Sequence, residues 1–436
     1  MRQKLSNRNL LLVGFTLFSM FFGAGNLIFP PFLGAMAGDR TWSAMAGFLI
    51  SAVGLPVLGV AAVAMSGGLM KLAGRVHPRF AFVFTLLIYL SIGPCLAIPR
   101  TASTSFEMAV LPYLGKNGPS VSTAQLLYSV AFFAIAMTLA LKPEKLTDRL
   151  GKILCPTLLT LIAVIFTGCL VWPLGPYAAA DASYATGAAT KGFLEGYQTM
   201  DTIAALNFGI IIAMNIQAKG VNDEGSVVRE TIKAGVVAGI LMALVYGALA
   251  HVGAPAARMM ANVGNGARIL TFVADRVFGR AGMILLGLIF FIACLNTCVG
   301  LLSCCSEYFT TVFPVLGYRA WLVVFGLVSV VISNVGLNRI LAFSVPVLNI
   351  IYPVAIVLIA LAFLNPLIRR WRYVYPCSIL FTGVVSVLYA LDQRYVPAVV
   401  AKLPGYTSGL GWILPAAAGL VAGIALSAAA GAGQMD

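Results

Sequence analysis

The sequence has few charged residues and almost no histidine. Of its 436 residues only 10% are charged, 14 are acidic and 2 are histidine. Ordinary soluble domains carry about 25% charged residues. This composition argues against a soluble protein and against a disordered chain. The excess of 28 basic residues does not indicate a nucleic-acid binder, because these residues lie in short clusters between apolar stretches.

The residue patterns of metal centres, redox sites and enzymes are also missing. All eight cysteines lie in or beside apolar stretches, and none forms a C-x-x-C pair. They are best interpreted as small buried apolar residues, which excludes a secreted disulfide scaffold. No H-E-x-x-H motif or pair of carboxylates marks a catalytic cluster, so an integral-membrane enzyme is a distant alternative. A channel is disfavoured because no filter motif is present.

What the sequence has instead is apolar length. Hydrophobic residues make up 60% of the chain, and a spanning helix needs roughly 20 of them in a row. Alternating strands of a barrel are absent, so helices are expected. The first stretch follows a basic N-terminus, as in a signal peptide, but its length predicts a retained helix. The predicted spans, about twelve, are 9–36, 42–65, 81–106, 122–141, 152–174, 194–217, 231–252, 281–311, 320–335, 340–364, 374–391 and 410–431.

Lysine and arginine are distributed unevenly between the loops. If the N-terminus is inside, seventeen lie in inner segments, ten lie in outer segments, and Arg100 lies within the third span. Four of the outer arginines share the longest outer loop, where the positive-inside rule acts less strictly. The distribution predicts that both termini face the cytoplasm.

The first predicted span is interrupted by glycine and proline. Residues 19–31 read SMFFGAGNLIFPP, with Gly23 and Gly25 one residue apart and Asn26 directly after them. Glycine permits non-helical backbone and proline lacks an amide donor. An unwound helix frees carbonyls for a cation and amides for an anion. The segment therefore predicts a binding site, with a kink at a close helix contact as the alternative.

The sixth predicted span contains an acid. Residues 195–209 read EGYQTMDTIAALNFG, which places Asp201 inside an apolar stretch, while Glu195 lies at its outer end. Acids inside the membrane usually mark paths of ions, protons or substrates. Asp201 is expected to bind a cation, carry a proton or hold a substrate ammonium. The alternative is a structural pair with Arg100.

The eighth predicted span carries neutral polar side chains. Residues 293–300 read ACLNTCVG, and Asn296 and Thr297 offer neutral oxygens, which suit a hard cation such as sodium. Hydrogen bonding between helices is common for these residue types in membranes. For this segment alone, that structural interpretation is the preferred one.

The positions of the interrupted spans suggest two repeats. Spans one and six would be the first helices of two five-helix repeats, approximately 9–174 and 194–364, with two extra helices at approximately 374–431. Because five is odd, the second repeat must be inverted in the membrane. We therefore expect an all-α polytopic membrane protein forming a single transporter domain over residues 1–436. Its site should lie at the midplane, between the broken helices.

Three segments make a family recognisable. They are FFGAGNLIFPPFLG at 21–34, EGYQTMDTIAALNFG at 195–209 and ACLNTCVGL at 293–301. With them the chain resembles the branched-chain amino acid:cation symporter family, within the LeuT-fold superfamily, over essentially all twelve spans. The resemblance implies a LeuT-like 5+5 inverted repeat with helices one and six broken. It further implies sodium-coupled symport of leucine, isoleucine and valine by alternating access, in a bacterial inner membrane surrounded by lipid.

The resemblance also implies a substrate site. Backbone of the broken first helix would hold the carboxylate, and carbonyls of span six, with Asp201, would hold the ammonium. Apolar residues of span six would surround the aliphatic side chain. The residues expected to contact the substrate are Gly23, Ala24, Gly25, Met200, Asp201, Ile203 and Phe208.

Two sodium sites are implied as well. Asn26 and Thr202 would belong to the first, although no clear equivalent of the family's helix-seven asparagine is present. The second would combine carbonyls of Ser19, Phe22 and Ala293 with the side chains of Asn296 and Thr297. The family pattern commonly has two hydroxyl residues in helix eight, and Asn296 departs from it. A proton-coupled transporter or an exchanger that uses Asp201 is the alternative, and it predicts sodium-independent transport.

Overall fold

The described part of the chain is a bundle of helices. The computed structural model describes residues 4–114, 119–142, 147–260, 263–391 and 397–431, and these ranges contain no strand. The residues at both ends, to which the predicted cytoplasmic termini belong, lie outside them. Within the described residues, seven helices are long and apolar enough to cross a membrane, and a bent pair makes an eighth. All twelve predicted spans coincide with helical segments.

The first five predicted spans correspond to a series of helices with several interruptions. Span one comprises α1 and α2, span two comprises α3 and α4, and span three comprises α6 and α7. A short helix, α5, precedes span three. The bounds are α1 Asn7–Phe21, α2 Ala24–Ala37, α3 Thr41–Leu49, α4 Leu55–Ser66, α5 Leu69–Gly74, α6 Pro78–Leu90, α7 Ala97–Ala109, α8 Val121–Ala140 and α9 Cys155–Val171.

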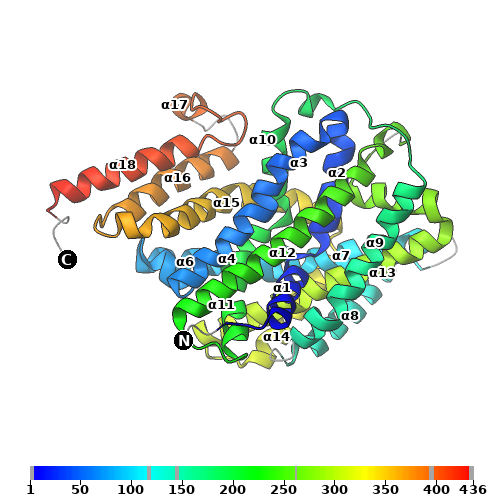
Figure 1. Cartoon of the computed structure of the whole chain (residues 1–436), viewed down its shortest axis with the longest axis horizontal. Helices are drawn as coiled ribbons and strands as arrows, with labels where there is room; N and C mark the ends of the chain where they lie inside the picture. Colours follow the sequence, from blue (N-terminus) through cyan, green and yellow to red (C-terminus); the bar gives the residue numbers. More distant parts are fainter. Residues whose placement is uncertain (1–3, 115–118, 143–146, 261–262, 392–396, 432–436) are drawn as a thin grey trace.

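The remaining spans follow in order, and the last two helices lie to one side. There α16 and α18 pack on each other beside α15 (Figure 1). The bounds are α10 Ala188–Glu195, α11 Asp201–Gln217, α12 Glu224–Gly253, α13 Gly266–Val312, α14 Tyr318–Ser333, α15 Leu337–Ile368, α16 Val374–Ala390, α17 Ala398–Ala401 and α18 Ile413–Ala429.

The breaks predicted in spans one and six are both present. In span one, Phe22 (φ −75°, ψ 89°) and Gly23 (φ −125°, ψ −150°) leave helical geometry between α1 and α2. In span six, Met200 has φ 68° and is the one described non-glycine residue with positive φ. The two halves of span six bend by 50° there. Left-handed backbone at a side-chain-bearing residue is strained, and such strain clusters at functional sites.

Span three has an interruption that the sequence analysis above does not predict. Its helix passes through a π-helical turn at Ser91–Cys95, where Gly93 has φ −87° and ψ −130°. The signal for it is the dipeptide Gly93-Pro94, which marks breaks in any context. The eighth span also differs from its predicted bounds, because α13 begins at Gly266 and kinks at Gly279 (φ 56°). Part of the loop predicted between spans seven and eight is therefore helical.

Helices α2 and α12 approach each other as closely as glycine permits. A Cβ atom added at Gly34 would overlap the carbonyl of Ala250, and one added at Gly253 would overlap the carbonyl of Pro31. Small residues allow such contacts, which hold membrane helices together where no hydrophobic driving force acts between them. The contact fixes α2, the second half of span one, against α12 of span seven.

This packing predicts that Gly34→Ala destabilises the protein. Overpacking a tight contact costs about 1–3 kcal/mol, so the melting temperature in detergent should fall. Gly74→Ala is the matched control, because its Cβ would meet nothing within 4 Å and alanine favours a helix. Fluorescence-detected size-exclusion chromatography after heating measures both variants. Equal melting temperatures for the two would contradict the packing argument.

Candidate functional site

The interruptions of spans one, three and six meet at one small cavity. It lies among α1, α2, α7, α11 and α13, and its volume of about 20 Å³ is room for one or two water molecules. A larger ligand therefore requires these elements to separate. The lining residues are Met20, Phe21, Gly23, Ala24, Asn26, Ile92, Ala97, Arg100, Thr101, Thr199, Met200, Asp201, Ala204, Phe208, Thr297 and Leu301.

A buried hydrogen-bond network joins the two predicted breaks. Asn26 Nδ2 donates to Asp201 Oδ2 at 2.6 Å and also to the hydroxyl of Tyr246. The Tyr246 hydroxyl in turn donates to Asp201 Oδ2 at 3.0 Å. Asp201 is 2% exposed, and the other two are also buried. Spans one, six and seven thus share a single carboxylate oxygen.

Two members of the network, Asn26 and Asp201, lie in the first turn of a helix. Asn26 Oδ1 accepts a hydrogen bond from the backbone N–H of Gly23 at 3.0 Å and so caps α2. Asp201 is the first residue of α11, where the helix dipole stabilises a negative charge. The breaks therefore create the environment that makes a buried carboxylate tolerable.

Arg100 of α7 reaches the break in span six from the opposite side. Its Nη1 donates to the carbonyl of Gln198 at 2.8 Å, and its Nη2 donates to the carbonyl of Thr199 at 3.4 Å. The guanidinium lies 5.9 Å from the ring centroid of Phe29. The structural pair considered above is not formed, because no ion pair joins Arg100 to Asp201 among the described residues.

The predicted residues of spans one and eight also meet. Asn296 Nδ2 donates to Ser19 Oγ at 3.2 Å, while Asn296 Oδ1 and Thr297 Oγ1 are buried without a hydrogen-bond partner. Thr297 lies against Gly23, where an added Cβ would come 2.6 Å from its Oγ1. Unpartnered neutral oxygens at a helix break have the chemistry of a hard-cation site. Phe22 and Ala293, whose carbonyls were predicted ligands, are fully buried beside them.

Some predicted residues lie away from the cavity. The hydroxyl of Thr202 donates to the carbonyl of Ser51 in span two at 3.1 Å. Ile203 does not line the cavity, and Ala204 does, because residues 201, 204 and 208 share one face of a helix. Gly25 is not a lining residue either.

A wider pocket of about 350 Å³ lies beyond Arg100. Its lining includes Phe29 and Gln198, which both contact Arg100, and the ion pair of Lys191 with Glu195 at 3.4 Å. Arg100 therefore lines the small cavity and contacts two residues that line this pocket.

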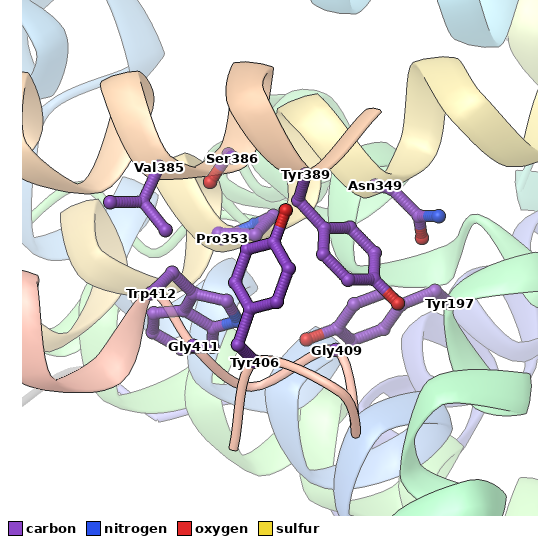
Figure 2. A pocket seen from close by; sticks show the side chains of 10 residues that line it. All are labelled: Tyr197, Asn349, Pro353, Val385, Ser386, Tyr389, Tyr406, Gly409, Gly411 and Trp412. Carbon is purple, nitrogen blue, oxygen red and sulfur yellow. The ribbon is translucent and has the colours of Figure 1, made fainter. Parts of the chain in front are cut away.

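The segment before α18 covers the first half of span six, which precedes the break. Figure 2 shows Tyr406 and Trp412 of this segment beside Tyr197, around a small pocket. Tyr197, three residues before the break, stacks on Tyr352 with ring centroids 4.3 Å apart. An added Cβ at Gly409 would lie 2.9 Å from the side chain of Leu194. The segment before α18 thus packs against the residues that precede the break.

Two polar residues were not predicted as part of a site. Tyr246 is a lone hydroxyl in an apolar span, which is a weak signal because tyrosine also occurs as an ordinary core residue. Glu230 is a second buried acid, 1% exposed, and it pairs with Lys233 at 2.7 Å. Its position near the start of α12 keeps it apart from the cavity residues.

The chain is similar to bacterial permeases along its whole length. A family model described as "Branched-chain amino acid transport protein" matches residues 6–430. The chain is 40% identical over 435 residues to the branched-chain amino acid permease BraB of Bacillus subtilis, covering 98% of this chain and 97% of that protein. It is 37% identical over 440 residues to the branched-chain amino acid permease BrnQ of Escherichia coli K12, covering 99% and 98%.

Solved transporter structures have the same fold at low identity. Mhp1, a nucleobase-cation-symport-1 family transporter in a closed conformation with bromovinylhydantoin, superposes with a TM-score of 0.64 at 14% identity, covering 95% of this chain and 91% of that one. MhsT in complex with L-phenylalanine gives 0.57 at 16% identity, covering 98% and 100%. The fold is the LeuT fold, as expected from the sequence.

The network predicts that Tyr246→Phe destabilises the protein. Removing the hydroxyl leaves Asp201 and Asn26 each short of one partner, which costs about 1–3 kcal/mol in a buried site. Tyr308→Phe is the control, because the Tyr308 hydroxyl is buried and has no hydrogen-bond partner in the described part of the chain. Thermal melting in detergent should fall for the first variant only. A melting temperature unchanged in Tyr246→Phe would show that the network contributes no stability.

Proposed function

We propose, from the premise that this chain belongs to the branched-chain amino acid transport protein family, that it imports leucine, isoleucine and valine together with sodium. The observation that carries the proposal is the junction of the two broken spans at Asn26 and Asp201, beside a cavity. Broken helices that meet at the membrane midplane are the usual sites of substrate and coupling ion in transporters.

The amino acid would bind between the two breaks. The Asp201 carboxylate would stabilise the ammonium group, and the first amides of α2 would stabilise the carboxylate. Met200, Phe208 and Phe21 provide apolar surface for the aliphatic side chain. Such surface distinguishes one methylene by only about 1–3 kcal/mol. One carrier shared by leucine, isoleucine and valine is therefore physically easier than three.

Sodium would bind between α1 and α13. The unpartnered oxygens of Asn296 and Thr297 support this, with carbonyls of Ser19, Phe22 and Ala293 as further ligands. Asn26 and Thr202 remain proposed ligands of a first sodium, although Thr202 bonds to Ser51 here. One sodium moving inward gains about 2.3 kcal/mol per 100 mV, which sustains roughly a 50-fold gradient of substrate.

Transport would proceed by alternating access. The cavity holds too little volume for an amino acid, so binding and release require the helices around it to separate on one side at a time. The proposed repeats, 9–174 and 194–364, would move relative to each other about the site. The protein would lie in a bacterial inner membrane with both termini in the cytoplasm.

A proton-coupled carrier or an exchanger is the second candidate. The observation that favours it is Asp201, an acid buried in the network beside the cavity. Leucine uptake into proteoliposomes decides between the two. Symport with sodium predicts accumulation under an inward sodium gradient at equal pH. Accumulation driven by a pH gradient without sodium would favour the second candidate and overturn the first.

The proposed sodium site predicts that Thr297→Ala weakens the dependence on sodium. Loss of one oxygen ligand should raise the sodium concentration for half-maximal leucine uptake by about tenfold, which is about 1.4 kcal/mol. Thr310→Ala is the control on the same helix, because its hydroxyl bonds to the carbonyl of Ser306 at 2.7 Å. Equal sodium dependence in both variants would count against the site.

The proposed ammonium site predicts that Asp201→Asn nearly abolishes uptake. Removing the charge from a buried polar network costs at least about 2 kcal/mol, or about 30-fold. Asp275→Asn, at an exposed position of α13, is the matched control and should transport normally. Full leucine uptake by Asp201→Asn would remove the role of this acid in either candidate mechanism.

A further inference from the structure

We propose that Arg100 binds the carboxylate of the transported amino acid and thereby makes the carrier specific for amino acids over amines and amides. The proposal rests on the function proposed above, since it names a further residue of the same substrate site. It assigns the carboxylate a full positive charge in addition to the backbone amides of α2.

Arg100 carries a charge that no acidic side chain among the described residues contacts in an ion pair. It is 4% exposed, and the described residues contain no ion pair to it. A guanidinium does not lose its proton in a protein, and an unpaired charge inside a membrane is costly. Two backbone carbonyls supply part of the compensation. A bound anion would supply the rest.

The guanidinium also has donor capacity left. Of its five N–H groups, the two carbonyl contacts use one on Nη1 and one on Nη2, and Nε is buried without a partner among the described residues. The planar guanidinium matches a carboxylate, which it binds through two parallel hydrogen bonds. Arg100 is therefore a better match for a carboxylate than for a single carbonyl.

The position of Arg100 brings it to the start of α2. An added Cβ at Gly25 would lie 2.9 Å from Nη2, so the guanidinium packs on the second residue of that helix. The first amides of a helix lack intrahelical partners and favour an anion. α2 has 14 residues. Its N-terminus and Arg100 together form a composite anion site.

The charges around the cavity are arranged for a zwitterion. Arg100 and Asp201 both line it, yet they do not neutralise each other through a direct ion pair. Arg100 bonds to the two residues that precede Met200, and Asp201 directly follows Met200. A molecule with an ammonium and a carboxylate on one carbon would compensate both charges at once.

The same residue contacts the lining of the wider pocket. Phe29 and Gln198 line that pocket and contact Arg100. An amino acid that enters from this pocket would meet the guanidinium before it reaches the cavity. Binding of the carboxylate would then replace the long bond to Thr199, at 3.4 Å, which is the weaker of the two carbonyl contacts.

The test compares two ligands that differ only in whether they carry a carboxylate or an amide. L-Leucine and L-leucinamide share the ammonium and the side chain, but leucinamide lacks the carboxylate. Affinities of the full-length protein in nanodiscs with sodium are measured by isothermal titration calorimetry. The native protein should bind leucine at least about 30-fold more tightly than leucinamide, as expected for a buried charge pair. Arg100→Gln should reduce that ratio to near 1, chiefly by weakening leucine.

Two further variants make the outcome decisive. Arg75→Gln removes an arginine that bonds to Tyr375 outside the cavity and should leave the ratio unchanged. Arg100→Lys keeps the charge and should retain a preference for leucine of several-fold. If Arg100→Gln binds neither ligand, the ratio of the two affinities in Arg100→Lys decides, because a retained preference for leucine supports the proposal.

The possible failures are distinguishable. A purely bracing role for Arg100 predicts that leucine and leucinamide weaken equally in both Arg100 variants, and that result would overturn the inference alone. A native protein that binds no leucine with sodium would instead overturn the proposed function, and the inference with it.

Discussion

The hydrogen bond between Asn26 and Asp201 is the interaction on which the site depends. Both residues lie at places where a membrane helix stops, and both would be costly in hydrocarbon without a partner. Asn26 and Asp201 bond to each other and to Tyr246, so their polar side chains at the breaks have hydrogen-bond partners. The breaks in turn supply the helix end that accommodates the carboxylate. Neither the breaks nor the polar residues are tolerable alone.

The surrounding structure follows from holding these breaks in place. Span one is fixed by glycine contacts of α2 with α12. Span six, strained at Met200, is held by Arg100 on one side and by the aromatic residues around Tyr197 on the other. The segment that leads into α18 therefore supports the residues before the break. The small cavity lies between these supports.

Much of the site could be predicted because composition in a membrane is restrictive. An apolar stretch with Gly23, Gly25 and Asn26, or with Asp201, has few explanations other than a break or a site. The interruption of span three was harder, since Gly93-Pro94 also fits an ordinary kink. Tyr246 gave almost no signal, because one hydroxyl in a long apolar helix does not reveal which neighbour it will meet. Ile203 shows the opposite case. Its closeness to Asp201 in the sequence suggests that it lines the site, but helix geometry places it on a different face of α11 from the residues that line the cavity.

The sequence by itself determined that the chain is a helical membrane protein, where its spans lie and that spans one and six are broken. It does so because hydrocarbon tolerates only helices with satisfied backbones, and because the exceptions stand out against an apolar background. The tertiary structure decided which exceptions meet. Arg100 and Asp201 were a plausible ion pair by sequence. In the fold, Arg100 instead bonds to the carbonyls of the two residues before Met200, and both charged side chains line the cavity. That arrangement depends on contacts between residues about a hundred positions apart, and no local pattern encodes it.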